Sequence, residues 1–149
     1  MILFINGSPN KDGNTARLAR ELIGDRPYEQ LNLAEHKVYG YGQNYCDDDF
    51  EDVLARIEAA DTLVVGSPVY WHNLSGMLRN LLDRFYGPVR EGSMSGKTLY
   101  FVFQGGAPTR EMLDWGEYTM KRFAALYGMT YGGMVDNTHE ARALSKKLA

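Results

Sequence analysis

Met1-Ile2-Leu3-Phe4-Ile5-Asn6 is an apolar, strand-like run that leads directly into the polar loop Gly7-Ser8-Pro9-Asn10-Lys11-Asp12-Gly13-Asn14-Thr15. An amphipathic helix pattern follows the loop at once. At the start of a helix, unpaired backbone N–H groups and the positive end of the helix dipole attract an anion. This stretch therefore predicts a strand, a phosphate-binding loop and a helix in succession.

The loop offers several neutral hydrogen-bond donors to a phosphate. The hydroxyls of Ser8 and Thr15 and the amides of Asn10 and Asn14 can each donate, and Lys11 can add a positive charge. The loop is neither a Gly-x-Gly-x-x-Gly fingerprint nor a P-loop, because it lacks the required glycines and the Gly-Lys-Ser/Thr ending. A plain connection between strand and helix, capped by Asn14, is the alternative interpretation.

Strand and helix patterns alternate along the rest of the chain. Short apolar or β-branched runs indicate four more strands, at residues 28–33, 62–65, 98–103 and 129–135. Apolar residues at helical spacing indicate a first helix that begins at the N-cap Asn14 and a second that begins at Asp47-Asp48-Asp49. Later helices are predicted around the apolar positions Leu78 to Phe85, Met112 to Tyr127 and His139 to Leu148.

This alternation predicts a doubly wound α/β sandwich that forms a single domain over residues 1–149. Ligands of such folds bind outside the carboxyl ends of the strands. Three of the loops expected at that edge have an unusual composition, namely residues 7–15, 67–76 and 104–109. We therefore expect the three loops to converge on one site.

Composition limits the class of protein. The chain has 149 residues with 44% apolar and 23% charged residues, which is ordinary for a globular protein. It has no apolar run of about 20 residues and no secretion signal at its start, so we expect a cytoplasmic protein that does not enter a membrane. Cys46 alone can form neither an internal disulfide nor a metal site. The net charge of −3 argues against nucleic-acid binding.

The second loop carries the most specific motif, Gly66-Ser67-Pro68-Val69-Tyr70-Trp71-His72-Asn73-Leu74-Ser75-Gly76. Together with the first loop, it resembles the NAD(P)H-dependent FMN reductases and related quinone reductases, which are flavodoxin-like flavoproteins. The resemblance extends in order over nearly the whole chain. It implies a three-layer sandwich with a five-stranded parallel sheet of order 2-1-3-4-5 and helices on both faces.

The resemblance also implies a set of residues that hold FMN. The first loop would bind the phosphate through Ser8, Asn10, Asn14 and Thr15, with Lys11 as an additional charge. The second loop would surround the isoalloxazine ring with Pro68, Val69, Tyr70, Trp71, His72 and Asn73, and the third would close the other side with Gln104, Gly105 and Gly106. No catalytic side chain and no metal are expected, because the cofactor carries the redox chemistry.

Several of these residues have plainer interpretations. Tyr70 and Trp71 can form an aromatic wall for the ring, but they also suit a helix-capping cluster or a subunit contact. His72 and Tyr70 are candidates to lie near the ring, although a lone histidine in a loop is often solvated. Tyr39, Tyr41 and Tyr45 could cover the flavin of a partner subunit, as a family homodimer would suggest, or simply lie at the surface or in the core. Some relatives carry clustered cysteines for an iron-sulfur centre in this region, and this chain has only Cys46.

Two redox functions follow from this resemblance. The first is an enzyme that passes electrons from NADPH or NADH through FMN to a quinone, a flavin or another small acceptor. The second is a flavodoxin-type electron shuttle that serves a redox protein. The near-balanced charge and the absence of aromatic residues from Gln104 to Pro108 favour the enzyme. A phosphate-binding regulatory module without redox chemistry is a third possibility if no flavin binds.

Overall fold

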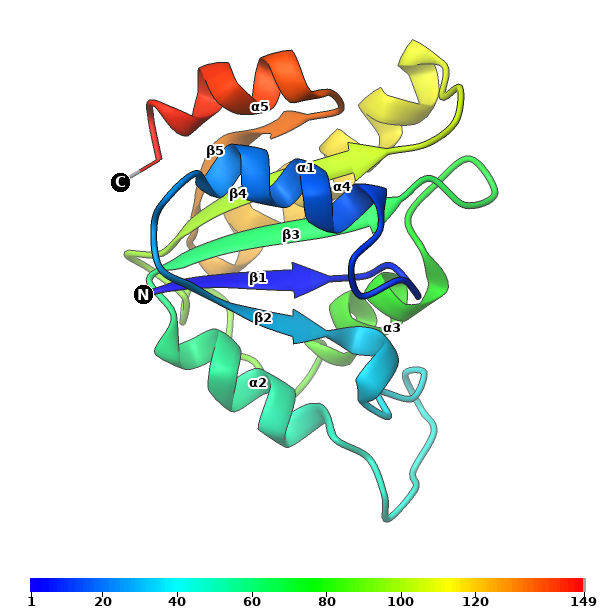
Figure 1. Ribbon diagram of the computed structural model, residues 1–149. Helices are drawn as coiled ribbons and strands as arrows, with labels where there is room; N and C mark the ends of the chain where they lie inside the picture. The colour runs from blue at the N-terminus through cyan, green and yellow to red at the C-terminus, as the bar shows by residue number, and fades with distance from the viewer. Residues whose placement is uncertain (149) are drawn as a thin grey trace.

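A five-stranded parallel sheet forms the centre of the protein in the computed structural model, which describes residues 1–148 (Figure 1). The strand order β2-β1-β3-β4-β5 confirms the predicted flavodoxin-like topology. All five strands lie where the sequence predicts them, with ends that differ by up to three residues. They are β1 (Ile2–Asn6), β2 (Tyr28–Asn32), β3 (Thr62–Pro68), β4 (Thr98–Gln104) and β5 (Thr130–Val135).

Helices cover both faces of the sheet. One apolar core lies under α1 (Asn14–Ile23) and α5 (Thr138–Ser145). A second, larger core lies on the other face, under α2 (Phe50–Ala59), α3 (Gly76–Arg84) and α4 (Arg110–Tyr127). A short 3-10 helix, η1 (Leu33–Glu35), follows β2, so Leu33, which the sequence predicts to end the strand, lies outside it. Among residues 1–148, no helix is both long enough and apolar enough to cross a membrane.

Burial of the strands follows their position in the sheet. All seven residues of β3 are buried, as expected for a central parallel strand covered on both faces. Most residues of the outer strands β2 and β5 are only half-buried or exposed. The pairing of β4 with β5 shifts its register between Leu99 and Tyr100. There Gly132 is required, because a Cβ at this position would lie 2.4 Å from a ring carbon of Tyr100.

The register of the strands places their carboxyl ends at one level. Asn6 at the end of β1 pairs with Asn32 on one side and with Gly66 on the other. Further along β3, Pro68 pairs with Gln104 at the end of β4. The loops that follow β1, β3 and β4 therefore open at the same edge of the sheet, on the right in Figure 1.

The start of α1 corrects one prediction. Asn14 is not the N-cap but the first residue of the helix, and the N-cap is Gly13. The Asn14 side chain points to its own helix, where its Oδ1 accepts a hydrogen bond from the guanidinium of Arg17.

The helix predicted from Asp47 begins at Phe50 instead, with Asp49 as the N-cap and with the Phe50 N–H donating to Asp48 Oδ1. Gly128 ends α4 in the left-handed conformation.

Candidate functional site

Direct hydrogen bonds join the three loops at the carboxyl edge of the sheet. The Gly7 carbonyl accepts a bond of 2.7 Å from the hydroxyl of Ser75, which belongs to the second loop. The Val69 N–H donates to the Gln104 carbonyl at 2.8 Å, which links the second loop to the third. The Gln104 side chain donates in turn to Thr15 Oγ1 at 3.0 Å. The three predicted loops thus form one connected site.

The first loop leaves the start of α1 open. Ser75, Thr109 and Asn137 cap α3, α4 and α5, each accepting a hydrogen bond from a first-turn N–H. At α1, by contrast, no side chain of residues 1–148 caps the first turn. The backbone N–H groups at this end are therefore available to an anion.

The hydroxyls of the first loop are buried, whereas its longer side chains are exposed. Ser8 and Thr15 are only 5% and 1% exposed. Ser8 Oγ shapes the loop by accepting a bond of 3.1 Å from the Asn10 N–H. The side chains of Asn10, Lys11 and Asn14 lie at the surface.

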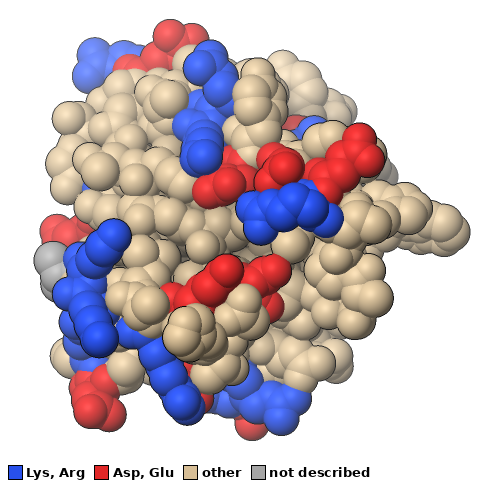
Figure 2. Space-filling model, turned by 90° about the horizontal axis from the view of Figure 1, so that it is seen from above, with Lys and Arg blue, Asp and Glu red and all other residues tan. Residues whose placement is uncertain are grey.

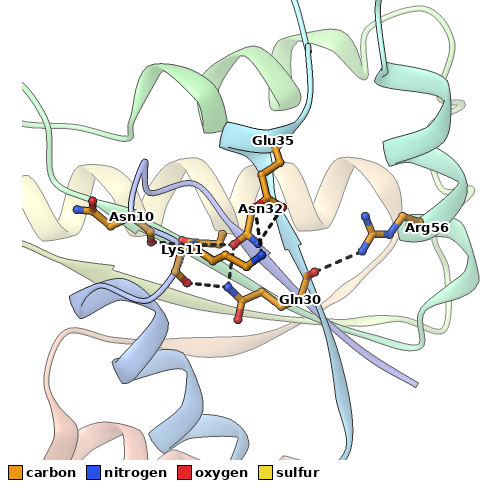
Figure 3. A network of polar contacts seen from close by, with 7 residues as sticks. Asn10, Lys11, Gln30, Asn32, Glu35 and Arg56 are labelled. Carbon is orange, nitrogen blue, oxygen red and sulfur yellow. Dashed lines mark hydrogen bonds and ion pairs between the residues drawn. The ribbon is translucent and has the colours of Figure 1, made fainter.

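Lys11 has a partner outside the loop. Its ammonium lies 3.1 Å from a carboxylate oxygen of Glu35 at the end of η1 (Figure 3). This contact and a weaker one from Asn32 hold the pKa of the Glu35 carboxyl below its usual value. The charge of Lys11 is thus already balanced by Glu35, and the loop presents mainly neutral donors.

The second loop has a tight tip with a strained backbone. Tyr70 and Asn73 exchange backbone hydrogen bonds of 3.0 and 3.1 Å. Between them, Trp71 and His72 adopt positive φ angles of 48° and 64°. This conformation costs a residue with a side chain about 1–2 kcal/mol. Such strain persists only where the surrounding contacts enforce it, and it is common at binding sites.

The tip presents both an aromatic ring and free amides. The Trp71 side chain is 95% exposed. The N–H groups of Val69, Tyr70 and Asn73 are used inside the site. Those of Trp71 and His72 have no acceptor within the described part of the chain. The loop therefore keeps two backbone donors for a ligand.

A hollow of about 330 Å³ lies between the second and third loops. The third loop contributes small residues, and a Cβ on Gly105 would lie 3.2 Å from Cβ of Val69. Apart from His72, none of the lining side chains is ionisable. The hollow is lined by Val69, Trp71, His72, Gly105, Gly106, Ala107, Pro108 and Met112.

Charged side chains lie around the site but not on the part that projects at its edge. Figure 2 shows Lys and Arg interspersed with Asp and Glu over the face seen from above. The tan projection at the right of that view, on the side of the carboxyl edge, has no charged residues. An uncharged, partly apolar hollow beside a set of neutral donors suits a flat ring joined to a phosphate. Among residues 1–148, no three His, Cys, Asp or Glu side chains gather as a metal ion would need.

The structure brings most of the predicted residues together and adds some that the sequence did not indicate. Gln104 donates from its side chain to Thr15, so it links the third loop to the first, and its predicted contact with the ring stays a prediction. Ser75, which joins the first two loops, is signalled only by its position before the helix at Gly76. Asn6 also holds the first loop and is itself bonded by Asn32, and the only signal of these two residues is a polar residue at the end of a strand.

The predicted tyrosines lie in the segment of residues 36–49, which contacts α3. The ring centres of Tyr39 and Tyr45 are 4.5 Å apart, and the Tyr39 hydroxyl donates a hydrogen bond of 2.9 Å to Asp47. The ring of Tyr41 packs edge-on against the exposed ring of Tyr86, which follows α3, with 6.2 Å between the ring centres. All of these contacts lie within one chain, and a role against a partner subunit stays a prediction.

Comparisons with known proteins agree with this geometry. An iron-sulfur flavoprotein of Methanocaldococcus jannaschii is 32% identical over 97 residues, covering 56% of this chain and 50% of that protein. An NAD(P)H-dependent FAD/FMN reductase of Geobacillus thermodenitrificans is 25% identical over 91 residues, covering 59% and 47%. The chain thus spans about half the length of these curated relatives.

Solved structures show the same fold over almost the whole chain. The Trp repressor binding protein of Bacillus subtilis has a TM-score of 0.79 at 23% identity, covering 100% of this chain and 99% of that one. An FMN-dependent NADH-azoreductase of Bacillus anthracis, solved in complex with FMN, has a TM-score of 0.71 at 15% identity, covering 98% and 94%. The sequence model of the NADPH-dependent FMN reductases matches residues 1–139, and the chain therefore belongs to this family.

Proposed function

We propose that this protein is an FMN-dependent NAD(P)H oxidoreductase that delivers electrons to a quinone, a flavin or another small acceptor. The observation that carries the proposal is the hollow of about 330 Å³, lined without Asp, Glu, Lys or Arg, at the same edge of the sheet as the open start of α1, to which Gln104 links the third loop. FMN has the two parts that this arrangement suits, a flat ring and a terminal phosphate. The family match over residues 1–139 supports the same cofactor.

The chain's own residues would divide the work of holding FMN. Ser8, Thr15 and the first-turn N–H groups of α1 would bind the phosphate, since they are buried or otherwise without an acceptor. The free N–H groups of Trp71 and His72 would donate to the polar edge of the ring. FMN, when bound, supplies the acceptor for hydride from the nicotinamide. The small third loop would leave one face of the ring accessible to donor and acceptor in turn.

The electron-shuttle function is the second candidate. It shares the FMN site but requires a docking surface for a redox protein. The net charge of −3 gives little electrostatic attraction to a basic partner. The third loop also offers no aromatic side chain to cover the ring, from Gln104 to Pro108. Both features favour the enzyme.

Anaerobic reduction separates the two functions. The FMN-loaded protein is mixed with NADH or NADPH without oxygen, and the flavin absorbance is followed before quinone, free flavin and azo acceptors are added. Rapid bleaching by at least one nicotinamide, and recovery on addition of a small acceptor, is expected of the reductase. FMN binding without bleaching would support the shuttle, and absence of FMN binding would exclude both.

The phosphate assignment has its own test. Replacing Ser8 and Thr15 together by Ala removes two buried hydroxyls, each worth about 1.5–3 kcal/mol if it bonds a charged phosphate. The double variant should lose FMN affinity by at least tenfold and keep its affinity for riboflavin, which lacks the phosphate. Fluorescence titration with both flavins measures this. The control S95A/T130A removes the same groups at the opposite edge of the sheet, and equal losses for both flavins would contradict the assignment.

We also propose that the protein is a cytoplasmic homodimer. A second hollow of about 360 Å³ lies between α3 and α4, away from the three loops. Its lining includes Tyr86, Tyr118 and Leu126, which are 59%, 66% and 38% exposed, beside the charged Arg79, Asp83 and Arg122. Covering this surface with a second copy would bury them. Sedimentation should show a dimer that Y118E converts to a monomer, and a monomeric wild-type protein would contradict the proposal.

A further inference from the structure

A network of side-chain amides lies beneath the first loop, outside the set of residues that would touch the cofactor (Figure 3). Asn6 and Asn32 are 0% and 5% exposed. They meet because the parallel register of β1 and β2 pairs these two positions at the strand ends. Burying two amides is costly unless their polar atoms are satisfied, so their hydrogen bonds indicate what the pair does.

Asn6 spans the turn of the first loop. Its Oδ1 accepts from the Ser8 N–H at 3.1 Å, and its Nδ2 donates to the Asn10 carbonyl, also at 3.1 Å. The same Nδ2 donates to Asn32 Oδ1 at 3.2 Å. The orientation of the Asn6 amide is thereby fixed from β2, and with it the path of the loop from Ser8 to Asn10.

Two further side chains hold the next residue of the loop, Lys11. Gln30 Nε2 donates to the Lys11 carbonyl at 2.8 Å, and Glu35 pairs with the Lys11 ammonium at 3.1 Å. Both of these side chains also bond Asn32. Gln30 donates to Asn32 Oδ1 at 2.7 Å, and Asn32 Nδ2 donates to Glu35 Oε2 at 3.4 Å.

Asn32 is therefore the common partner of the three side chains that hold the stretch from Ser8 to Lys11, although no hydrogen bond joins its own side chain to the loop. We propose that Asn32 is a positioning residue for the cofactor phosphate. Through Asn6, Gln30 and Glu35 it fixes the backbone from Ser8 to Lys11 in the shape that receives the anion. A loop that is ordered in advance loses less conformational entropy when it binds.

This inference rests on the proposed phosphate site, and it makes a distinct prediction. Replacing Asn32 by Ala leaves every proposed phosphate donor in place but removes the shared partner of their supports. FMN should then bind roughly tenfold more weakly, about the value of one or two hydrogen bonds, while the affinity for riboflavin stays within twofold. A residue with only a structural role would lower thermal stability without changing the ratio of the two affinities.

The matched control is Asn80 in α3, which donates from its side chain to the Val38 carbonyl at 3.3 Å and does not contact the first loop. N80A removes the same amide and should leave the FMN-to-riboflavin ratio unchanged. Should N32A fail to fold, Q30A removes one support from the loop without changing its charge. It should then weaken FMN by about threefold without an effect on riboflavin, as about half of one hydrogen bond would predict.

Fluorescence titration of both flavins, with thermal unfolding in parallel, decides between the outcomes. A selective loss of FMN affinity in N32A supports the proposal. An unchanged ratio in N32A, or in Q30A where N32A does not fold, overturns it. Should S8A/T15A leave the ratio unchanged as well, the phosphate assignment itself is wrong. Should S8A/T15A lower the ratio while N32A does not, only the role of Asn32 is lost.

Discussion

At the scale of single residues, Gly7 lies where the first loop passes closest to the second. Its N–H donates to the Gly66 carbonyl at 2.8 Å, and its own carbonyl accepts from Ser75. A Cβ on Gly7 would lie 2.8 Å from the Gly66 oxygen and 3.1 Å from Cβ of Leu78. Neither atom belongs to a flexible side-chain end, so the backbone would have to move.

We expect G7A to lower the free energy of unfolding by about 1–3 kcal/mol, the usual cost of overpacking. FMN affinity should fall with it, because Gly7 leads into the phosphate loop. Denaturant unfolding of the apo protein and FMN titration measure the two effects. G76A is the control, since a Cβ there has nothing within 4 Å and alanine favours a helix. A G7A protein as stable as G76A would show that the close approach costs nothing.

At the scale of elements, runs of apolar residues and their spacing predict the strands and helices. Contacts between residues that lie far apart in the sequence are not predicted. The run Thr62–Val65 predicts β3 because a strand buried on both faces needs continuous apolar residues. The prediction for Asn14 is wrong because a favourable N-cap residue does not determine which residue ends up at the N-cap. The Asn6–Asn32 contact depends on strand register, which is set across 26 residues of chain.

The segment of residues 36–49 shows how one ion pair can hold an element without regular structure. Arg84 of α3 pairs with Asp48, and their side chains are only 17% and 15% exposed. The guanidinium also donates to the Tyr39 carbonyl at 3.2 Å and lies 4.7 Å from the centre of the Phe50 ring. Removing Arg84 would leave the Asp48 carboxylate largely buried without its cation.

R84A should therefore lower the free energy of unfolding by about 2 kcal/mol and increase hydrogen exchange between residues 36 and 49. The control R110A breaks an exposed pair with Asp114 and should change stability by less than about 0.5 kcal/mol. Equal effects of the two variants, or unchanged exchange in R84A, would mean that Arg84 does not anchor the segment.

At the scale of the whole molecule, surface carboxylates determine how stability depends on pH. Four of them have a pKa below the ordinary value, which is 4.5 for Glu and 3.8 for Asp. The main cause in each case is a hydrogen bond that the carboxylate accepts from a cation. The pairs are Glu21 with Arg142, Glu35 with Lys11, Asp47 with Lys37, and Asp61 with the amino terminus.

Because the folded pKa values lie below the unfolded ones, these groups stabilise the fold above about pH 4.5, and the contribution is lost as the pH falls through the folded values. The thermal midpoint should therefore decrease between pH 5 and pH 3. Since all four groups are at the surface, high salt should make this decrease shallower. E21Q removes one of the titrating groups and should also reduce the slope. A midpoint that stays constant or rises on acidification would show that these pairs do not stabilise the folded state.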